Sequence, residues 1–196
     1  KIGDPFFIPW DESSQLAQGE ALLRIFLDTG ATVVAEDLGV LPHFLRPSLD
    51  RLGVPGYRVM RWEREWLESG SPFMDPRRYP ARSVAATGTH DTETMAAWLD
   101  GLGAEERGVV AGVLERVGAR VPEAGRADPA VDALLAAIYA SASDELFIPM
   151  QDLFGWRDRI NTPATVTPDN WTWRIPWAVD EMLALPEAAS RADFLR

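Results

Sequence analysis

The stretch Ala31-Thr32-Val33-Val34-Ala35-Glu36-Asp37 decides the fold prediction, because an apolar, β-branched run ends directly on two carboxylates. A short continuous apolar run is typical of a strand buried on both faces of a parallel sheet. Before it, residues 15–29 carry apolar side chains at helical spacing up to Gly30, which predicts a helix. In α/β barrels, catalytic groups lie at the carboxyl ends of the strands. Glu36 is therefore a candidate functional residue.

Strands and helices continue to alternate along the rest of the chain. Further strands are expected over 57–62, 83–87 and 145–151, and helices over 42–52, from 92 or 94 to 99, over about 104–118 and 128–142, and over 181–196. Residues 152–177 are expected to form a loop. This order indicates an α/β fold with parallel pairing. Four strands are too few for a closed barrel of about 250 residues, so the pattern fits a small open sheet or half of a barrel.

The composition restricts the class of partner. The 196 residues are 46% hydrophobic and carry a net charge of −11, which disfavours nucleic acid and anionic membranes but not a neutral sugar. No apolar run approaches the roughly 18 residues of a membrane span. The absence of cysteine excludes disulfides and is compatible with a cytoplasmic protein. The chain begins on Lys1 rather than Met, which suggests a piece of a longer protein.

A second carboxylate, Asp91, follows another predicted strand in Thr87-Gly88-Thr89-His90-Asp91-Thr92. Two carboxyl groups at one rim are the equipment of sugar-transfer chemistry, with Glu36 as proton donor if an apolar setting favours its protonated form. The alternatives are a solvated strand-end charge for Glu36 and a helix cap for Asp91. His90 and Asp91 could also bind a divalent metal, although no further ligand follows at a suitable spacing. Asp37 points to the other side and is expected to be structural.

Two polar segments follow the last predicted strand, at 157–163 and at 170–174, and the second of them carries two tryptophans. They suit sugar recognition, but a tightly hydrogen-bonded loop explains them equally well. The eight tryptophans allow the same two readings, core packing or flat surfaces for sugar rings.

Taken together, several segments resemble the C-terminal half of the 4-α-glucanotransferases, the amylomaltases or disproportionating enzymes of glycoside hydrolase family 77. The resemblance covers roughly residues 15–180 and depends on the order of the segments. These are Ala35-Glu36-Asp37-Leu38-Gly39, Val54-Pro55-Gly56-Tyr57-Arg58-Val59, Gly88-Thr89-His90-Asp91-Thr92, Gln151-Asp152, Arg159-Ile160-Asn161-Thr162-Pro163 and Asn170-Trp171-Thr172-Trp173-Arg174.

The resemblance implies that residues 1–196 form the C-terminal half of a TIM-barrel catalytic domain. They would supply about strands 5–8, with a helical insertion between the last two strands. Glu36 matches the general acid/base of a retaining mechanism, and Asp91 matches the third carboxylate, which stabilises the transition state through sugar hydroxyls. His90 matches the histidine that binds the same sugar. Asn161 would lie near the donor subsites. Trp62 stands where the family usually has a small residue or Phe and is assigned to substrate binding.

The family's nucleophile, an Asp in an Arg-x-Asp-His-like segment, has no counterpart in these 196 residues. The expected partners are therefore the N-terminal half of the barrel, together with α-1,4-glucans and maltooligosaccharides. No cofactor and no metal are expected, and the location is expected to be cytoplasmic. The chain alone is expected to be inactive. A glucan-binding pseudoenzyme is the main alternative, and a metal-dependent hydrolase built on His90 and Asp91 is a weaker one.

Overall fold

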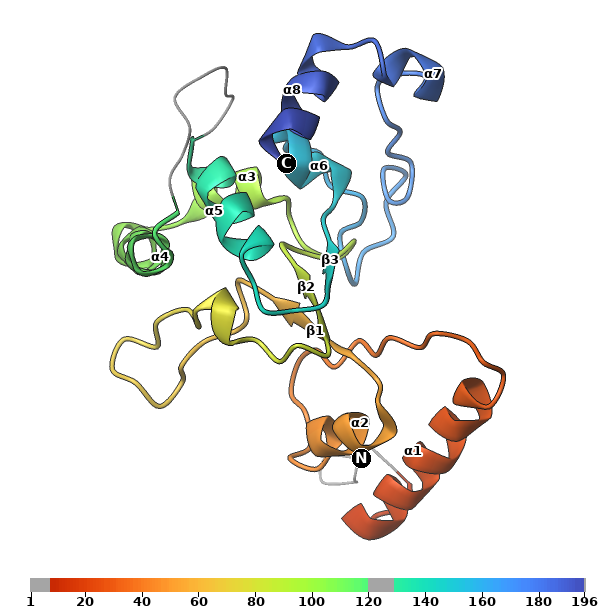
Figure 1. The fold of residues 1–196 in the computed structure, drawn as a ribbon. Helices are drawn as coiled ribbons and strands as arrows, with labels where there is room; N and C mark the ends of the chain where they lie inside the picture. The colour runs from red at the N-terminus through yellow and green to blue at the C-terminus, as the bar shows by residue number, and fades with distance from the viewer. Residues whose placement is uncertain (1–7, 120–128, 196) are drawn as a thin grey trace.

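A three-stranded parallel sheet lies at the centre of the computed structural model, which describes residues 8–119 and 129–195 (Figure 1). The strands are β1 (Gly56–Val59), β2 (Ser83–Ala86) and β3 (Glu145–Phe147), in the order β1-β2-β3. Ala86 lies opposite both Val59 and Phe147, so the carboxyl ends of all three strands meet at one edge. The predicted α/β class with parallel pairing is confirmed.

The predicted strand over 31–35 was wrong except at its last residue. Only Ala35 pairs with the sheet, through an isolated parallel bridge to Gly56, and its N–H donates to the carbonyl of Pro55 over 2.9 Å. Ala31 and Thr32 are exposed and have no neighbouring strand within the described part of the chain. An apolar run without a partner on either side forms no ladder of hydrogen bonds, whatever its β-propensity.

Two further strands are shorter than predicted, because the chain turns at their carboxyl ends. After β1, the N–H of Trp62 already bonds the carbonyl of Val59 in a turn. After β3, Pro149 precedes a short helix, α6 (Met150–Phe154), so the strand expected over 145–151 stops at Phe147. Proline cannot donate to a sheet and suits the start of a helix.

Helices account for most of the remaining regular secondary structure. α1 (Glu12–Leu27) and α2 (Leu45–Leu52) precede the sheet, and α3 (Met95–Gly101), α4 (Ala104–Val117) and α5 (Pro129–Tyr139) connect β2 to β3. The first residue of the helix predicted over 128–142 lies outside the described residues, as does residue 196. The helix predicted over 181–196 is divided into α7 (Val179–Met182) and α8 (Pro186–Phe194). A short 3-10 turn, η1 (Pro76–Arg78), precedes β2.

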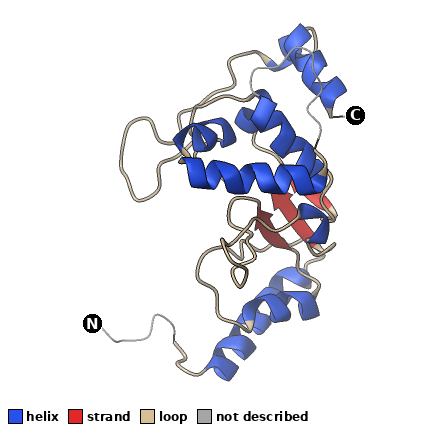
Figure 2. Cartoon of the chain, turned by 90° about the vertical axis from the view of Figure 1, so that its left-hand side faces the viewer, coloured by secondary structure: helices blue, strands red, loops and turns tan. Residues whose placement is uncertain are grey.

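The core lies between β2 and the layer of α3, α4 and α5, which sit together on one side of the sheet (Figures 1 and 2). All four residues of β2 are buried, as expected for the central strand of a parallel sheet. The helices contribute Met95, Ala96, Leu99, Val110, Val113, Val131, Leu134, Leu135, Ala137 and Ile138 to this core. This packing fixes the end of β2, from which one of the candidate site segments emerges.

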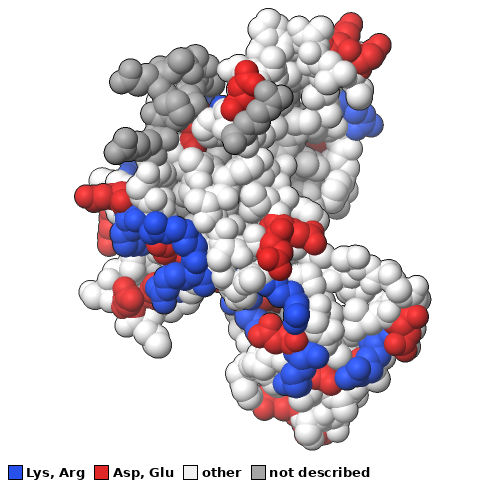
Figure 3. Space-filling model, in the orientation of Figure 1, with Lys and Arg blue, Asp and Glu red and all other residues white. Residues whose placement is uncertain are grey.

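α1 lies beyond β1 with α2 and has no buried residue (Figure 1). Leu22, Ile25 and Phe26 are more than half exposed, so its predicted apolar face does not pack on the described core. None of the helices within residues 8–119 and 129–195 combines the length and hydrophobicity that crossing a bilayer requires. On the face drawn in Figure 3, basic side chains form one larger group at the left edge with acidic side chains at its borders, and smaller groups of both signs lie lower in the view.

Candidate active site

Asp37 is a buried structural carboxylate, as predicted. Its oxygens accept hydrogen bonds from Arg46 Nε (2.9 Å), Arg58 Nη1 (3.0 Å) and the N–H of Tyr57 (2.6 Å), and its side chain is 1% exposed. Gly56 allows this approach, because a Cβ there would lie 2.4 Å from the Asp37 carboxylate. Asp37 therefore attaches the segment that carries Glu36 to the start of β1.

Glu36 lies on the opposite side of this segment and is exposed. It lines an open pocket of about 500 Å³. Other residues of this pocket are Tyr57, Gly88, Thr89, His90, Leu146, Phe147, Ile148, Pro149 and Ile160. Burial raises the pKa of the Tyr57 hydroxyl, and the negative charge of Glu36 raises it further. Glu36 and His90, two predicted site residues, therefore share one pocket with apolar walls.

The segment after β2 is a tight turn held by its own hydroxyl groups. Thr92 Oγ1 accepts from the N–H of Thr89 and donates to the carbonyl of Thr89, both over 3.0 Å. The N–H of Asp91 donates to Thr89 Oγ1 over 3.2 Å. Gly88 is required here, because a Cβ would lie 2.4 Å from Thr92 Oγ1. The turn presents His90 and Asp91 beyond the end of the strand.

Asp91, His90 and Asn161, three of the residues that the sequence named as site candidates, lie together in the structure. Asn161 Nδ2 donates to Asp91 Oδ1 over 2.6 Å, and His90 Nε2 lies 3.5 Å from the same oxygen. The His90 ring lies 5.1 Å from the ring of Trp171. Trp171 has a φ of +64°, a conformation that is strained for a bulky residue and is found mainly where surrounding contacts impose it. Trp171 was not named individually as a site residue, but it belongs to the segment 170–174 that suits sugar recognition, and it is an additional candidate for ligand contact.

Two residues that hold this cluster were not predicted. Arg159 Nη2 donates to the carbonyl of Asp91 over 2.8 Å, and Arg159 Nε donates to the carbonyl of Asn161 over 3.1 Å. Asp152, on α6, accepts from Thr87 Oγ1 (2.5 Å) and from the N–H of Met95 (2.6 Å). Asp152 thereby fixes both ends of the segment that carries His90 and Asp91. Burial raises the pKa of Asp152, against the effect of these two hydrogen bonds.

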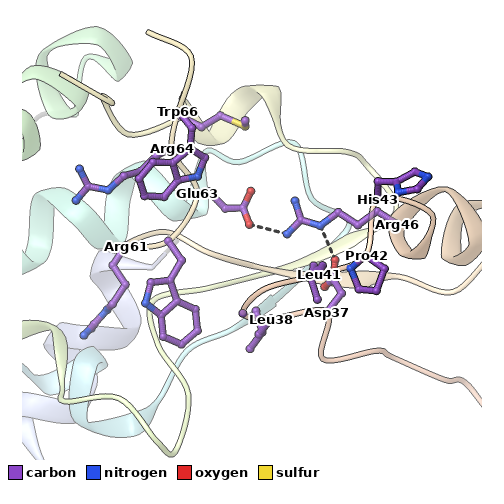
Figure 4. A pocket seen from close by; sticks show the side chains of 13 residues that line it. Asp37, Leu38, Leu41, Pro42, His43, Arg46, Arg61, Glu63, Arg64 and Trp66 are labelled. Carbon is purple, nitrogen blue, oxygen red and sulfur yellow. Dashed lines mark hydrogen bonds and ion pairs between the residues drawn. The ribbon is translucent and has the colours of Figure 1, made fainter. Parts of the chain in front are cut away.

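Trp62 lies in a different pocket, of about 610 Å³ (Figure 4). Arg46 crosses this pocket with an ion pair of 3.1 Å to Glu63, and Leu38 and Trp66 also line it. Trp62 is 43% exposed. Trp62 is thus separate from the pocket of Glu36 and His90, and its assignment to substrate binding stays a prediction.

Three of the tryptophans pack against one another rather than face solvent individually. Phe154 stacks on Trp156 at 4.8 Å and meets Trp177 at 5.2 Å, and Trp156 lies 5.9 Å from Trp173. Packing against one another therefore accounts for these partly buried rings, whereas Trp171 is 59% exposed beside His90. Among residues 8–119 and 129–195, no group of three or more His, Asp or Glu side chains is arranged to bind a metal. His90 and Asp91 thus find no third ligand there.

Comparison with known proteins gives consistent matches. A family model described as 4-alpha-glucanotransferase matches residues 9–180. The 4-alpha-glucanotransferase of Chlamydia pneumoniae is 29% identical over 90% of this chain and 34% of its own length. The chloroplastic and amyloplastic 4-alpha-glucanotransferase of Oryza sativa subsp. japonica is 33% identical over 83% of this chain and 26% of its own length. The chain thus spans about a third or less of the curated relatives it matches.

Solved structures show the same relationship. The amylomaltase from Streptococcus agalactiae in complex with acarbose has 27% sequence identity and a TM-score of 0.63, covering 83% of this chain and 30% of that chain. The amylomaltase from Corynebacterium glutamicum, at 17% identity and a TM-score of 0.66, covers 85% of this chain and 29% of that chain, and supports the fold alone.

Proposed function

Because the chain belongs to the 4-alpha-glucanotransferase family, glycoside hydrolase family 77, we propose that it is part of an enzyme that transfers α-1,4-glucan segments to glucose or maltodextrin acceptors. The observation that carries this proposal is the cluster of Asp91, His90 and Asn161 beside the pocket that Glu36 lines. A carboxylate that accepts a hydrogen bond from an amide and has an imidazole 3.5 Å away, with a second carboxylate at the adjoining pocket, suits retaining sugar transfer.

In this proposal Glu36 is the general acid/base. It protonates the glycosidic oxygen of the donor as the leaving glucan departs, and it then removes a proton from the acceptor hydroxyl. Its exposure at the mouth of an open pocket is compatible with access for both sugars. Asp91 accepts hydrogen bonds from sugar hydroxyls in the transition state, and His90 donates to the same sugar. Asn161 holds Asp91, and Trp62 binds the acceptor from the neighbouring pocket.

We further propose that residues 1–196 supply strands 5–8 of a TIM barrel. The bridging residue Ala35, then β1, β2 and β3, would be the four strands, with α3 to α5 as the helical insertion between the last two. The N-terminal half would add the nucleophilic Asp and cover both edges of the sheet, since open parallel edges leave backbone groups and apolar side chains unpaired. The short share of its relatives' length that the chain spans supports this.

The proposed substrates are α-1,4-glucans and maltooligosaccharides, in line with the acarbose complex of the similar amylomaltase. The cytoplasmic location expected from the sequence is part of the same proposal. Fractionation of cells into compartments, followed by detection of the intact protein, tests it.

The decisive experiment compares Glu36→Gln with the parent in the intact protein. With maltotriose as donor and acceptor, loss of the acid/base should reduce transfer by about 10²- to 10⁴-fold. With α-maltotriosyl fluoride, whose leaving group needs no protonation, a first burst of fluoride should remain while turnover stays slow. Glu68→Gln, at an exposed loop position, is the matched control and should transfer normally.

Three results would change the proposal. Normal transfer by Glu36→Gln would overturn the acid/base assignment. An intact parent protein that binds acarbose but never converts maltotriose would establish the glucan-binding pseudoenzyme instead. Turnover of maltotriose by residues 1–196 alone would show that no N-terminal half is needed.

A further inference from the structure

Glu93 lies between two arginines close to the proposed site. Its Oε1 is 3.4 Å from Arg61 Nη1, and its Oε2 is 3.7 Å from Arg159 Nη1. The Glu93 side chain is 40% exposed, the Arg159 side chain 32% and the Arg61 side chain only 6%. One carboxylate therefore joins a buried cation to a cation that is partly free to move.

Arg61 is the buried one of the two arginines that Glu93 contacts. It follows β1, and its guanidinium lies 4.9 Å from the ring centre of Trp98. Nη2 donates a long bond of 3.4 Å to the carbonyl of Thr87, while Nε and Nη1 are buried without a hydrogen-bond partner in the described residues. Burial lowers the pKa of Arg61, and the charge of Glu93 acts against this. A buried cation with so few hydrogen bonds depends on a nearby anion.

Arg159 is the arginine that reaches the proposed site. It donates to the main-chain carbonyls of both Asp91 and Asn161, the two residues whose side chains bond each other. The positive charges of Arg61 and Arg159 also act on one another, since the charge of Arg159 lowers the pKa of Arg61. Without Glu93 between them, this repulsion would act on Arg159, the more exposed and less constrained of the two.

We propose that Glu93 and Arg159 are positioning residues, which hold the main chain of Asp91 in place relative to the end of β1. The proposal rests on the proposed role of Asp91. Neither side chain is required to touch the sugar. The simpler alternative is a pair of surface ion pairs worth about 0–1 kcal/mol with no effect on the reaction. The positioning role predicts a loss of turnover and simple surface ion pairs do not, because misplacement of a reacting group by about 1 Å can reduce the rate about 10²-fold.

The test uses the intact protein with maltotriose and measures kcat, KM, the thermal midpoint and the Kd of acarbose. Glu93→Gln preserves the shape of the side chain and should lower kcat about 10-fold, with KM within about 2-fold. Arg159→Gln should lower kcat about 10²-fold, and Arg159→Lys should restore part of it. Because the two residues act through one contact, the double variant should resemble Arg159→Gln alone. The Kd of acarbose should rise across these variants in the same order in which kcat falls.

Arg77→Gln is the control. Arg77 lies in η1, outside the segments considered for sugar recognition, and pairs with Asp75 over 2.6 Å with about half of its side chain exposed, so its loss should leave kcat unchanged. If Arg159→Gln fails to fold, Glu93→Gln decides, because its side chain is partly exposed.

Asp91→Asn separates failure of this proposal from failure of the proposed function. If Asp91→Asn loses transfer while Glu93→Gln keeps the parent kcat, the positioning role is overturned and the role of Asp91 remains. A fall in the thermal midpoint of Glu93→Gln with an unchanged kcat overturns it equally. If Asp91→Asn itself retains full transfer, the proposed role of Asp91 is overturned, and the positioning role with it.

Discussion

The side-chain amide of Asn161 donates to Asp91 Oδ1 over 2.6 Å, although Asp91 precedes β3 in the sequence and Asn161 follows it. An amide is a neutral donor, so it orients the carboxylate without adding charge. His90 lies 3.5 Å from the same oxygen, so within residues 8–119 and 129–195 both of these contacts fall on Oδ1, and Oδ2 of Asp91 can accept from an external hydroxyl group. Activity should therefore depend on the neutrality of residue 161 as well as on its size.

In the intact protein, kcat plotted against pH is expected to fall on the acidic side. Asn161→Asp should move this acidic limb to higher pH by about one unit or more. Two carboxylates at hydrogen-bond distance cannot both remain ionised, so the pair takes up a proton nearer neutrality. Transfer from maltotriose measured between pH 4 and 8 checks this. Asn170→Asp is the control, because it adds the same charge in the same loop and keeps the oxygen that accepts from the N–H of Thr162, although it gives up the bonds that Nδ2 donates to Thr165. An unshifted limb in Asn161→Asp would contradict the prediction.

Gly88→Ala should impair transfer more than folding. The added Cβ would meet Thr92 Oγ1 at 2.4 Å, and rotation of Thr92 away from it would break the bonds that shape the turn before Asp91. We expect kcat to fall about 10- to 10²-fold, as for a small displacement of a reacting group. Gly101→Ala, at the end of α3, is the control, since its Cβ would meet nothing within 4 Å. Equal kcat values for the two variants would argue against the close contact at Gly88.

The local features of the site could be predicted from the sequence, but its supports could not. The end of an apolar run and the Thr87–Thr92 turn are visible in adjacent residues, and so are Glu36 and Asp91. Arg159 and Asp152 act through bonds to Asp91 and Thr87 across about 60 to 70 positions, which no spacing pattern records. The strand predicted over 31–35 was wrong for a related reason.

A strand is defined by its neighbours, and an apolar run only makes it possible. Only Ala35 reaches β1, so the ladder is limited to one bridge. β3 stops at Phe147 because Pro149 favours the start of α6, a local signal that the apolar run around it obscures. The positions of buried Arg61 and of Glu93 depend on packing that brings three segments together.

Asp37→Ala should destabilise the intact protein by about 3–5 kcal/mol, because it leaves the buried guanidinium of Arg58 without its partner. Urea or thermal unfolding followed by tryptophan fluorescence measures the effect. Asp50→Ala, at an exposed position on α2, should change stability by less than about 0.5 kcal/mol. A loss for Asp37→Ala no larger than that for Asp50→Ala would mean that Asp37 does not hold this segment to β1.

Asp152→Asn should remove a component of the pH dependence of stability. Burial raises the pKa of Asp152 above its ordinary value of 3.8, so the folded protein binds a proton at a pH where the unfolded chain does not. The carboxyl of Asp152 therefore contributes most to the stability of the fold below pH 3.8. This contribution is lost as the pH rises through the pKa that Asp152 has in the folded protein. Asparagine does not titrate, so the thermal midpoint of the parent minus that of Asp152→Asn should be largest near pH 4 and decline towards pH 7.

Thr87→Val sharpens this prediction. It removes the hydroxyl that donates to Asp152 Oδ2 and that lowers the pKa of this carboxyl. The Thr87→Val variant is compared with the double variant that also carries Asp152→Asn. The difference between their thermal midpoints should therefore persist to higher pH before it declines. A difference that stays constant across this range, or that grows as the pH rises, would show that the buried carboxyl is not the group that titrates.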